Sequence, residues 1–185
     1  PALRKKLQPI SVFIEFSARI GHDSHAFPQT IASGLSYSDA YQDWEVQMLI
    51  GCPKEIKPQE FRVGLTPNAA HEAVVHGHHV VVETQAGNGA GFIDDDYIQA
   101  GAKIVGTAAE VFAQADMIVK VKEPQPGERK MLRDGQLLFT YLHLAPDPDQ
   151  TRDLLASGCT AIAYETVTDA NGGLPLLAPM SEVAG

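Results

Sequence analysis

Basic residues are scarce in this sequence. Only 14 Lys and Arg stand against 23 Asp and Glu in 185 residues, which gives a formal net charge of −9. Contacts to phosphates supply most of the affinity for nucleic acids, and they require clustered positive charge. No basic stripe offsets the acidic balance, so the composition argues against a nucleic-acid-binding protein.

Cysteine and long apolar runs are also lacking. The two cysteines, Cys52 and Cys159, stand beside apolar residues. We expect small buried side chains in a reducing compartment, although a disulfide between them stays open from sequence alone.

No apolar run is long enough to cross a bilayer. The opening "PALRKKLQPISVFIEF" has the order of a signal peptide, but its apolar part is short and contains Glu15. We therefore expect a cytoplasmic protein without membrane association.

Residues 1–47 differ from the rest of the chain. They show little sustained periodicity apart from "ISVFIEF", whereas clean strand and helix patterns begin at Met48. We expect residues 1–47 to be a non-native or disordered leader; a genuine N-terminal extension is the alternative. A single domain then follows over residues 48–180. Ser181 before Glu182 predicts the start of a further helix over residues 181–185.

From Met48 onward, apolar β-branched segments alternate with helical ones. The expected strands are 48–53, 78–84, 102–106, 116–122, 136–143 and 159–165, with a last extended piece at 174–179. The expected helices lie within 66–77, 94–102, 107–115, 126–135 and 147–158. Alternation at this spacing predicts an α/β fold with a mostly parallel sheet flanked by helices.

Ionisable and polar side chains stand where the predicted strands end. Arg62 lies in the loop after the first strand, Lys122 ends a later strand, and Tyr141 and His143 end the next. Tyr141 and His143 should share one face, since side chains alternate along a strand. Glu165 ends the last strand. Ligands of open α/β sheets bind outside the carboxyl ends of the strands, so these groups should converge.

The convergent groups suit one kind of ligand. Arg62 can grip a carboxylate with two parallel hydrogen bonds, Lys122 can place a positive charge on a carbonyl oxygen, and His143 can exchange a proton near neutral pH. Taken singly, each has a simpler explanation: a solvated arginine, a lysine at a strand end, a histidine in the core. Together they predict a pocket for a small keto or amino acid.

Two motifs carry no such prediction. The glycine-rich "AGNGAGF" at 86–92 follows a strand, but its spacing is Gly87-x-Gly89-x-Gly91 rather than G-x-G-x-x-G, and three aspartates follow it. We interpret it as a turn. The histidines at 71, 76, 78 and 79 straddle a helix end and a strand start without ligand spacing, so we expect no metal site.

The region after Met48 resembles the N-terminal part of the bacterial L-alanine dehydrogenase family. The matching stretches run in order through almost all of it: "IGCPKEIKPQEFRVGLTP", "GHHVVVETQAGNGAGFIDDDY", "ADMIVKVKEP", "LLFTYLHLAPD", "AIAYETV" and "LPLLAPMSEVAG". The alpha subunit of proton-translocating transhydrogenase shares the opening pattern but differs at the equivalents of "KVKEP" and "LLAPMSEVAG". The resemblance implies that residues 48–180 are a Rossmann-like N-terminal substrate domain.

The resemblance also implies a reaction: NAD-dependent oxidative deamination of L-alanine to pyruvate and ammonia by a hexamer. It implies that Arg62 holds the substrate carboxylate, Lys122 contacts the carbonyl or amine-derived end, and His143 is the general acid/base. On the resemblance alone, Tyr141 lines the pocket and Ser181 touches the cofactor. The family's NAD-binding domain is not among these 185 residues, so we expect the fragment itself to be inactive. A transhydrogenase-like subunit, or a stand-alone domain that binds small carboxylates without catalysis, is the alternative.

Overall fold

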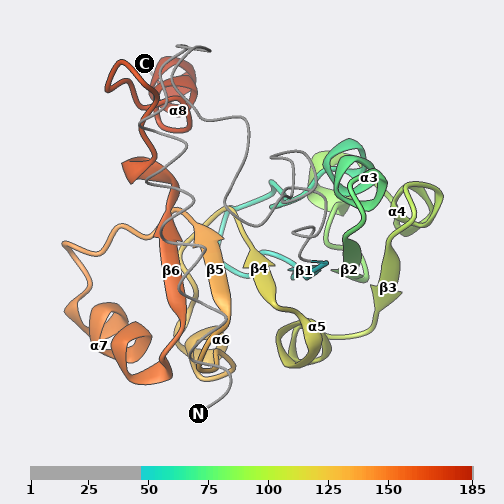
Figure 1. Ribbon diagram of the computed structural model, residues 1–185, viewed down its shortest axis with the longest axis horizontal. Helices are drawn as coiled ribbons and strands as arrows, with labels where there is room; N and C mark the ends of the chain where they lie inside the picture. The colour runs from blue at the N-terminus through green and yellow to red at the C-terminus, as the bar shows by residue number, and fades with distance from the viewer. Residues whose placement is uncertain (1–46, 185) are drawn as a thin grey trace, which may run out of the picture. The chain divides into compact units, whose positions relative to one another are not determined.

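A computed structural model describes residues 47–184 of the chain, and the leader expected at 1–47 lies outside these residues apart from its last position. The model confirms the α/β fold: six parallel strands form one sheet in the order β3-β2-β1-β4-β5-β6 (Figure 1). The strands are β1 Leu49–Cys52, β2 His79–Glu83, β3 Lys103–Val105, β4 Met117–Val119, β5 Leu137–Thr140 and β6 Thr160–Ala163. β1 lies in the middle of the sheet; β2 and β3 extend it on one side, and the chain then crosses to add β4, β5 and β6 on the other.

The strands are connected mainly by helices. These are α3 Pro67–Val75, α4 Asp94–Gln99, α5 Ala108–Gln114, α6 Pro126–Arg129, α7 Pro148–Ser157 and α8 Ala178–Ala184, with short 3-10 helices at Asn88–Ala90 and Tyr164–Thr166. Local sequence explains where several begin. The hydroxyl of Thr66 accepts the N–H of Ala69 before the proline that opens α3, and Thr107 forms a capping box with Glu110 at the start of α5.

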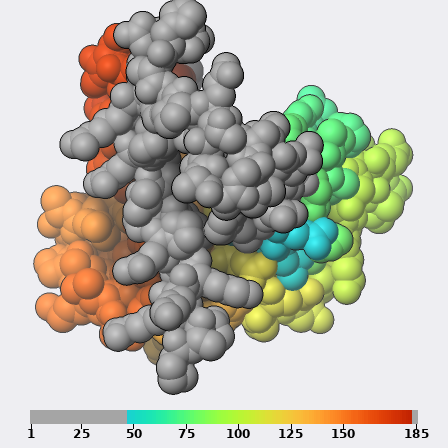
Figure 2. Space-filling view, viewed as in Figure 1, coloured from blue at the N-terminus to red at the C-terminus, as the bar shows by residue number. Residues whose placement is uncertain are grey.

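Alternating side chains of the strands supply two apolar clusters. Val80 and Val82 of β2 pack in one cluster with Tyr97 of α4. Val81, between them, belongs to the other cluster together with Phe112 of α5. Successive side chains of a strand point to opposite faces of the sheet, so the two clusters lie on opposite faces. Helices therefore cover both faces, with α4 on one and α5 on the other. In the space-filling view, the green surface of α3 and α4 lies on the opposite side from the orange surface of α7, as the strand order requires (Figure 2).

All six strands belong to one compact unit, which comprises Val46–Val167 and Leu176–Gly185. Residues 168–175 are grouped in a different unit. Within that segment, the carboxylate of Asp169 accepts the N–H groups of Asn171 and Gly173 and thereby closes a turn. Among the described residues, no helix is both long and apolar enough to cross a membrane.

Three details of the sequence prediction are wrong. The residues at 174–179 are not extended; a turn leads directly into α8, which begins at Ala178 rather than Ser181. Pro179 fits there because proline is tolerated in the first turn of a helix. Tyr141 and His143 do not share a strand face, because β5 ends at Thr140 and the backbone of His143 is left-handed, with φ of 48°.

Candidate functional site

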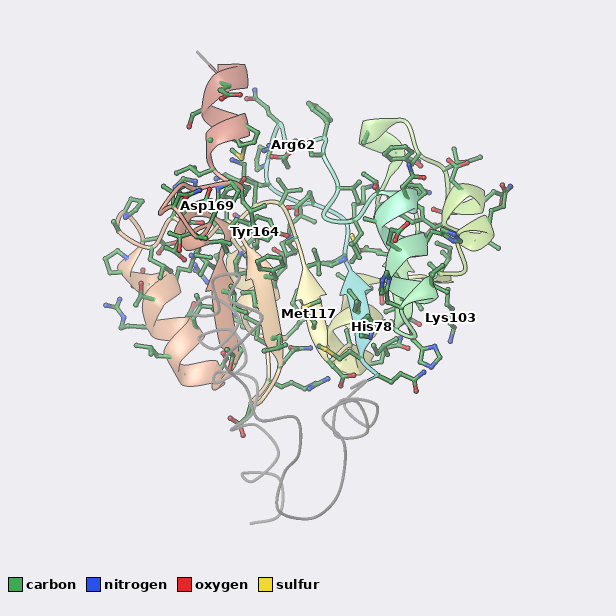
Figure 3. All side chains as sticks on the ribbon, turned by 45° about the horizontal axis from the view of Figure 1, so that its top comes forward. Arg62, His78, Lys103, Met117, Tyr164 and Asp169 are labelled. Atoms are coloured by element: carbon green, nitrogen blue, oxygen red, sulfur yellow. The ribbon has the colours of Figure 1, made fainter. Side chains whose placement is uncertain are left out.

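A pocket of about 450 Å³ lies where the strands end. Apart from two residues of the α8 region, all of its lining residues are at the end of a strand or in a segment that follows one: Arg62, Val63, Gly64, Thr66, Ala90, Phe92, Lys120, Val121, Phe139, Tyr141, Tyr164, Leu176 and Met180. Figure 3 shows Arg62 and Tyr164 toward this end of the sheet, whereas His78, Lys103 and Met117 mark the opposite end. The strand-end rule therefore located the pocket correctly.

The pocket brings together two of the side chains expected from sequence. Arg62 and Tyr141 both line it, whereas Lys122, His143 and Ser181, all within the described residues, are not among its lining. Their functional roles stay predictions.

Lys122 and His143 nevertheless lie close to the lining along the chain. The carbonyl of half-buried Lys122 accepts a hydrogen bond from the hydroxyl of Thr140, the residue before Tyr141, at 2.9 Å. His143 is exposed, and its backbone N–H donates to the carboxylate of Glu165 at 2.8 Å. Glu165, which we expected only at the strand end, thus holds the backbone of the segment that carries His143.

The backbone around Arg62 is held by two close approaches that require glycine. A side chain at Gly64 would place Cβ 2.5 Å from the carbonyl oxygen of Val119, at the end of β4. A side chain at Gly89 would place Cβ 2.5 Å from the carbonyl oxygen of Phe61. Both distances are far inside van der Waals contact with fixed backbone atoms, so glycine permits the packing that fixes the segment carrying Arg62.

The guanidinium of Arg62 is paired with Glu60. Its Nε lies 2.8 Å from Oε1 of Glu60 and its Nη2 lies 2.6 Å from Oε2, and the backbone N–H of Arg62 also donates to Oε1 at 2.9 Å. These hydrogen bonds lower the pKa of Glu60 and raise that of Arg62. Sequence analysis missed Glu60, because an acid in an irregular loop has no periodicity that reveals its partner.

A buried ionic cluster lies beside the pocket. The ammonium of Lys120 is 2.8 Å from a carboxylate oxygen of Glu128 and 3.1 Å from one of Glu55, and the three side chains are at most 2% exposed. Burial alone would lower the pKa of Lys120, but the two carboxylates outweigh it and raise that pKa. The other oxygen of Glu55 accepts the N–H of Val121 at 2.7 Å. The cluster fixes the chain just before Lys122, and Lys120 was not singled out from the sequence.

Aromatic rings form another wall. Tyr164 packs edge-on against Phe139, with 4.2 Å between ring centroids, and against Tyr141, with 4.9 Å. The hydroxyl of Tyr141 donates to the carbonyl oxygen of Leu176, ahead of α8, and burial raises the pKa of Tyr164. These rings line the pocket together with Arg62, and a largely apolar lining with one guanidinium suits a small organic carboxylate.

The described residues give little support for a metal or a dinucleotide at this site. No group of three or more His, Cys, Asp or Glu among residues 47–184 could hold a metal ion. The glycine-rich segment at 86–92 forms turns and a 3-10 helix, as expected. The carboxylate of Asp94, just after this segment, accepts the hydroxyl of Thr84 and the N–H of Gln85. An anionic group in that position does not fit a pyrophosphate.

Comparison with known proteins identifies the family of the chain. Residues 51–184 match the family model described as "Alanine dehydrogenase/PNT, N-terminal domain". The chain is 56% identical over 138 residues to the alanine dehydrogenase of Halomonas elongata and 54% identical over 138 residues to that of Mycobacterium tuberculosis H37Rv. Both matches cover 75% of this chain and 37% of the relative. The chain therefore spans little more than a third of the length of these relatives.

Solved structures give the same result. An L-alanine dehydrogenase structure is 57% identical, with a TM-score of 0.70, and the match covers 72% of this chain and 37% of that one. A transhydrogenase from Sinorhizobium meliloti is 31% identical, with a TM-score of 0.60, over 63% of this chain and 35% of that one. The chain belongs to the alanine dehydrogenase/PNT family, and residues 51–184 are its N-terminal domain.

Proposed function

We propose that this domain supplies the substrate pocket of an NAD-dependent alanine dehydrogenase. The overall reaction converts L-alanine, NAD⁺ and water into pyruvate, ammonium, NADH and a proton. The observation that carries the proposal is the arginine at the strand-end pocket: Arg62 presents a guanidinium beside Tyr141 and the aromatic wall. A guanidinium and an apolar wall in one pocket suit a ligand that has one carboxylate and a short apolar side chain.

Within this proposal, Arg62 binds the substrate carboxylate and Tyr141 lines the pocket beside it. Lys122 contacts the carbonyl oxygen of pyruvate or the amine-derived end of alanine. His143 transfers protons to and from the substrate as nitrogen and water exchange at the carbonyl carbon. The left-handed backbone of His143 supports a functional role, since strained non-glycine residues cluster at active sites. Neither Lys122 nor His143 lines the pocket, so their proposed roles rest on the family resemblance and on their position along the chain beside the lining residues Val121 and Tyr141.

NAD is proposed to bind mainly outside residues 47–184, because the glycine-rich segment here does not fit its pyrophosphate. Ser181, on α8 near the lining residue Met180, is the residue proposed to touch the cofactor. A hexameric assembly and a cytoplasmic location complete the proposal and rest on the family resemblance.

The test is NADH formation by the complete gene product, followed by absorbance. We expect NAD reduction that depends on L-alanine, and none when L-lactate replaces it. Absence of alanine-dependent reduction by a folded protein that binds pyruvate would support the alternative of a carboxylate-binding domain without catalysis. A transhydrogenase-like subunit is a second candidate, supported by the 31% identical transhydrogenase structure. Hydride exchange between two nicotinamide cofactors, without any requirement for alanine, would favour it.

A further inference from the structure

The guanidinium of Arg62 has two edges that can take a carboxylate side by side. One is formed by Nε and Nη2, and the other by Nη1 and Nη2. Glu60 occupies the first edge, with 2.8 Å between Nε and Oε1 and 2.6 Å between Nη2 and Oε2. A carboxylate ligand that keeps this pair intact therefore has the Nη1/Nη2 edge as its two-point contact.

Glu60 is a fixed part of the fold rather than a loose surface ion. Its side chain is 7% exposed, whereas that of Arg62 is 49% exposed. Its Oε1 also accepts the backbone N–H of Arg62 at 2.9 Å, and its own N–H donates to the carbonyl of Lys57 at 3.1 Å. The turn passes through Gln59 in a left-handed conformation, with φ of 65°. The acid is thus anchored, and the more exposed arginine is aligned against it.

The same pair changes the charge of the pocket. The two cationic side chains of the lining are Arg62 and Lys120. Arg62 is compensated by Glu60, and Lys120 faces the carboxylates of Glu55 and Glu128. The pKa of Glu60 is lowered mainly by its hydrogen bond to Arg62 and, as a smaller cause, by the positive charge of Lys122, which therefore lies near this pair. These three cations and three carboxylates cancel, so a carboxylate other than the one on the free edge of Arg62 would enter without a surplus cation to pair with it.

We propose that Glu60 is a positioning and specificity-determining residue: it aligns the free edge of Arg62 and cancels its charge, so that the pocket takes monocarboxylates and disfavours dicarboxylates. The inference rests on the proposed function, because it assumes that Arg62 receives the substrate carboxylate. Glu60 acts on alignment and on selectivity through two separate properties of its side chain, its length and its charge. Alignment depends on the length of the side chain, and selectivity depends on its charge.

The test measures ligand dissociation constants of the complete gene product by calorimetry. The ligands are 2-oxobutyrate and oxaloacetate, four-carbon keto acids in which a methyl group is replaced by a carboxylate. In Glu60→Gln we expect the preference to shift toward oxaloacetate by roughly tenfold, the size of one close charge–charge interaction partly screened by solvent. In Glu60→Asp the charge stays, but the shorter side chain cannot reach the guanidinium of Arg62. The affinity for 2-oxobutyrate should therefore fall, while the preference for 2-oxobutyrate over oxaloacetate is kept. Asp95→Asn, which removes an exposed acid of α4, is the matched control and should change neither quantity.

Pyruvate binding by the wild type tests the proposed function separately from the role of Glu60. If the wild type does not bind pyruvate, the proposed function fails. If the wild type binds pyruvate, an unchanged ratio of the affinities for oxaloacetate and 2-oxobutyrate in folded Glu60→Gln overturns the role of Glu60. Tighter binding of 2-oxobutyrate by Glu60→Gln also overturns it, because Glu60 would then compete with the ligand for Arg62. If a thermal melt shows Glu60→Gln to be unfolded, Glu60→Asp decides, and loss of the preference in that variant overturns the role.

Discussion

The ammonium of Lys120 and the carboxylate of Glu55 form an ion pair closed to solvent, with 3.1 Å between Nζ and Oε2. Glu128 completes the cluster on the same ammonium. Glu55 also binds the backbone N–H of Val121, so the loop after β1 holds the chain that leaves β4. Two loops that carry predicted site residues, Arg62 on one and Lys122 on the other, are thereby joined beneath the pocket.

Lys120→Met should strongly destabilise the protein. It leaves Glu55 and Glu128 buried without their cation, and breaking a buried pair in this way costs about 3–5 kcal/mol. The free energy of unfolding in urea measures the loss, and Lys130→Met, at an exposed lysine beside the cluster, is the control. Adding Glu128→Gln to Lys120→Met should recover part of the stability. A single variant as stable as the wild type would show that the cluster does not stabilise the fold.

Arg62→Lys should weaken binding of pyruvate. A lysine keeps the charge but loses the two-point contact, and one charge-assisted hydrogen bond contributes about 1.5–3 kcal/mol, or roughly 10- to 100-fold in affinity. Calorimetric titration of the complete gene product measures the change. Arg152→Lys, an exposed arginine of α7 that pairs with Asp149, should leave the affinity unchanged. Equal affinities for wild type and Arg62→Lys would remove Arg62 from the site.

His143→Ala should abolish most turnover of L-alanine while pyruvate binding stays largely intact. The reason is that the imidazole is proposed to move protons rather than to hold the carboxylate. Steady-state rates and a pyruvate titration separate the two effects, with His76→Ala at the exposed end of α3 as the control. Near wild-type rates in His143→Ala would refute the acid/base role.

Cys52 should make the protein less stable at alkaline pH. Both cysteines are free, and burial raises the pKa of the Cys52 thiol from 9.0 to about 12. Between these values the unfolded chain loses the proton and the folded one keeps it, so stability falls as pH rises, by at most roughly 1.4 kcal/mol per pH unit. Stability curves for the wild type and Cys52→Ala between pH 9 and 12 measure this contribution. The slope should be shallower in Cys52→Ala; parallel curves for wild type and Cys52→Ala would contradict the prediction.

The order and type of the main elements followed from the sequence because local signals agreed with the sheet. Apolar β-branched runs marked the strands. Three of the expected helix ranges, 66–77, 107–115 and 147–158, begin or end at residues that the structure shows as caps, namely Thr66, Thr107 and Gly158. The sequence did not predict where the strands end, because the alternation of apolar and polar residues continues beyond the last paired residues of the sheet. The backbone N–H of Tyr141 still donates to the carbonyl oxygen of Val121 at 3.3 Å, although β5 has ended at Thr140. The left-handed turn at His143 has no periodic signal.

The site was only partly predictable for a related reason. Arg62 was expected there because strand ends are the edge where ligands bind, and Tyr141 was expected to line the pocket from the family resemblance. Both line the pocket, and their roles in binding stay predictions. Glu55, Glu60 and Glu128 were missed, since their roles depend on contacts between loops or within an irregular turn. The pairing of Glu55 with Lys120 joins residues 65 positions apart, which no local pattern records.

A crystal structure of the complete gene product with pyruvate tests the central claim most directly. The pyruvate carboxylate should lie within hydrogen-bonding distance of Nη1 and Nη2 of Arg62, with Glu60 still on Nε and Tyr141 beside the ligand. Pyruvate bound away from Arg62, with the strand-end pocket empty, would contradict the account.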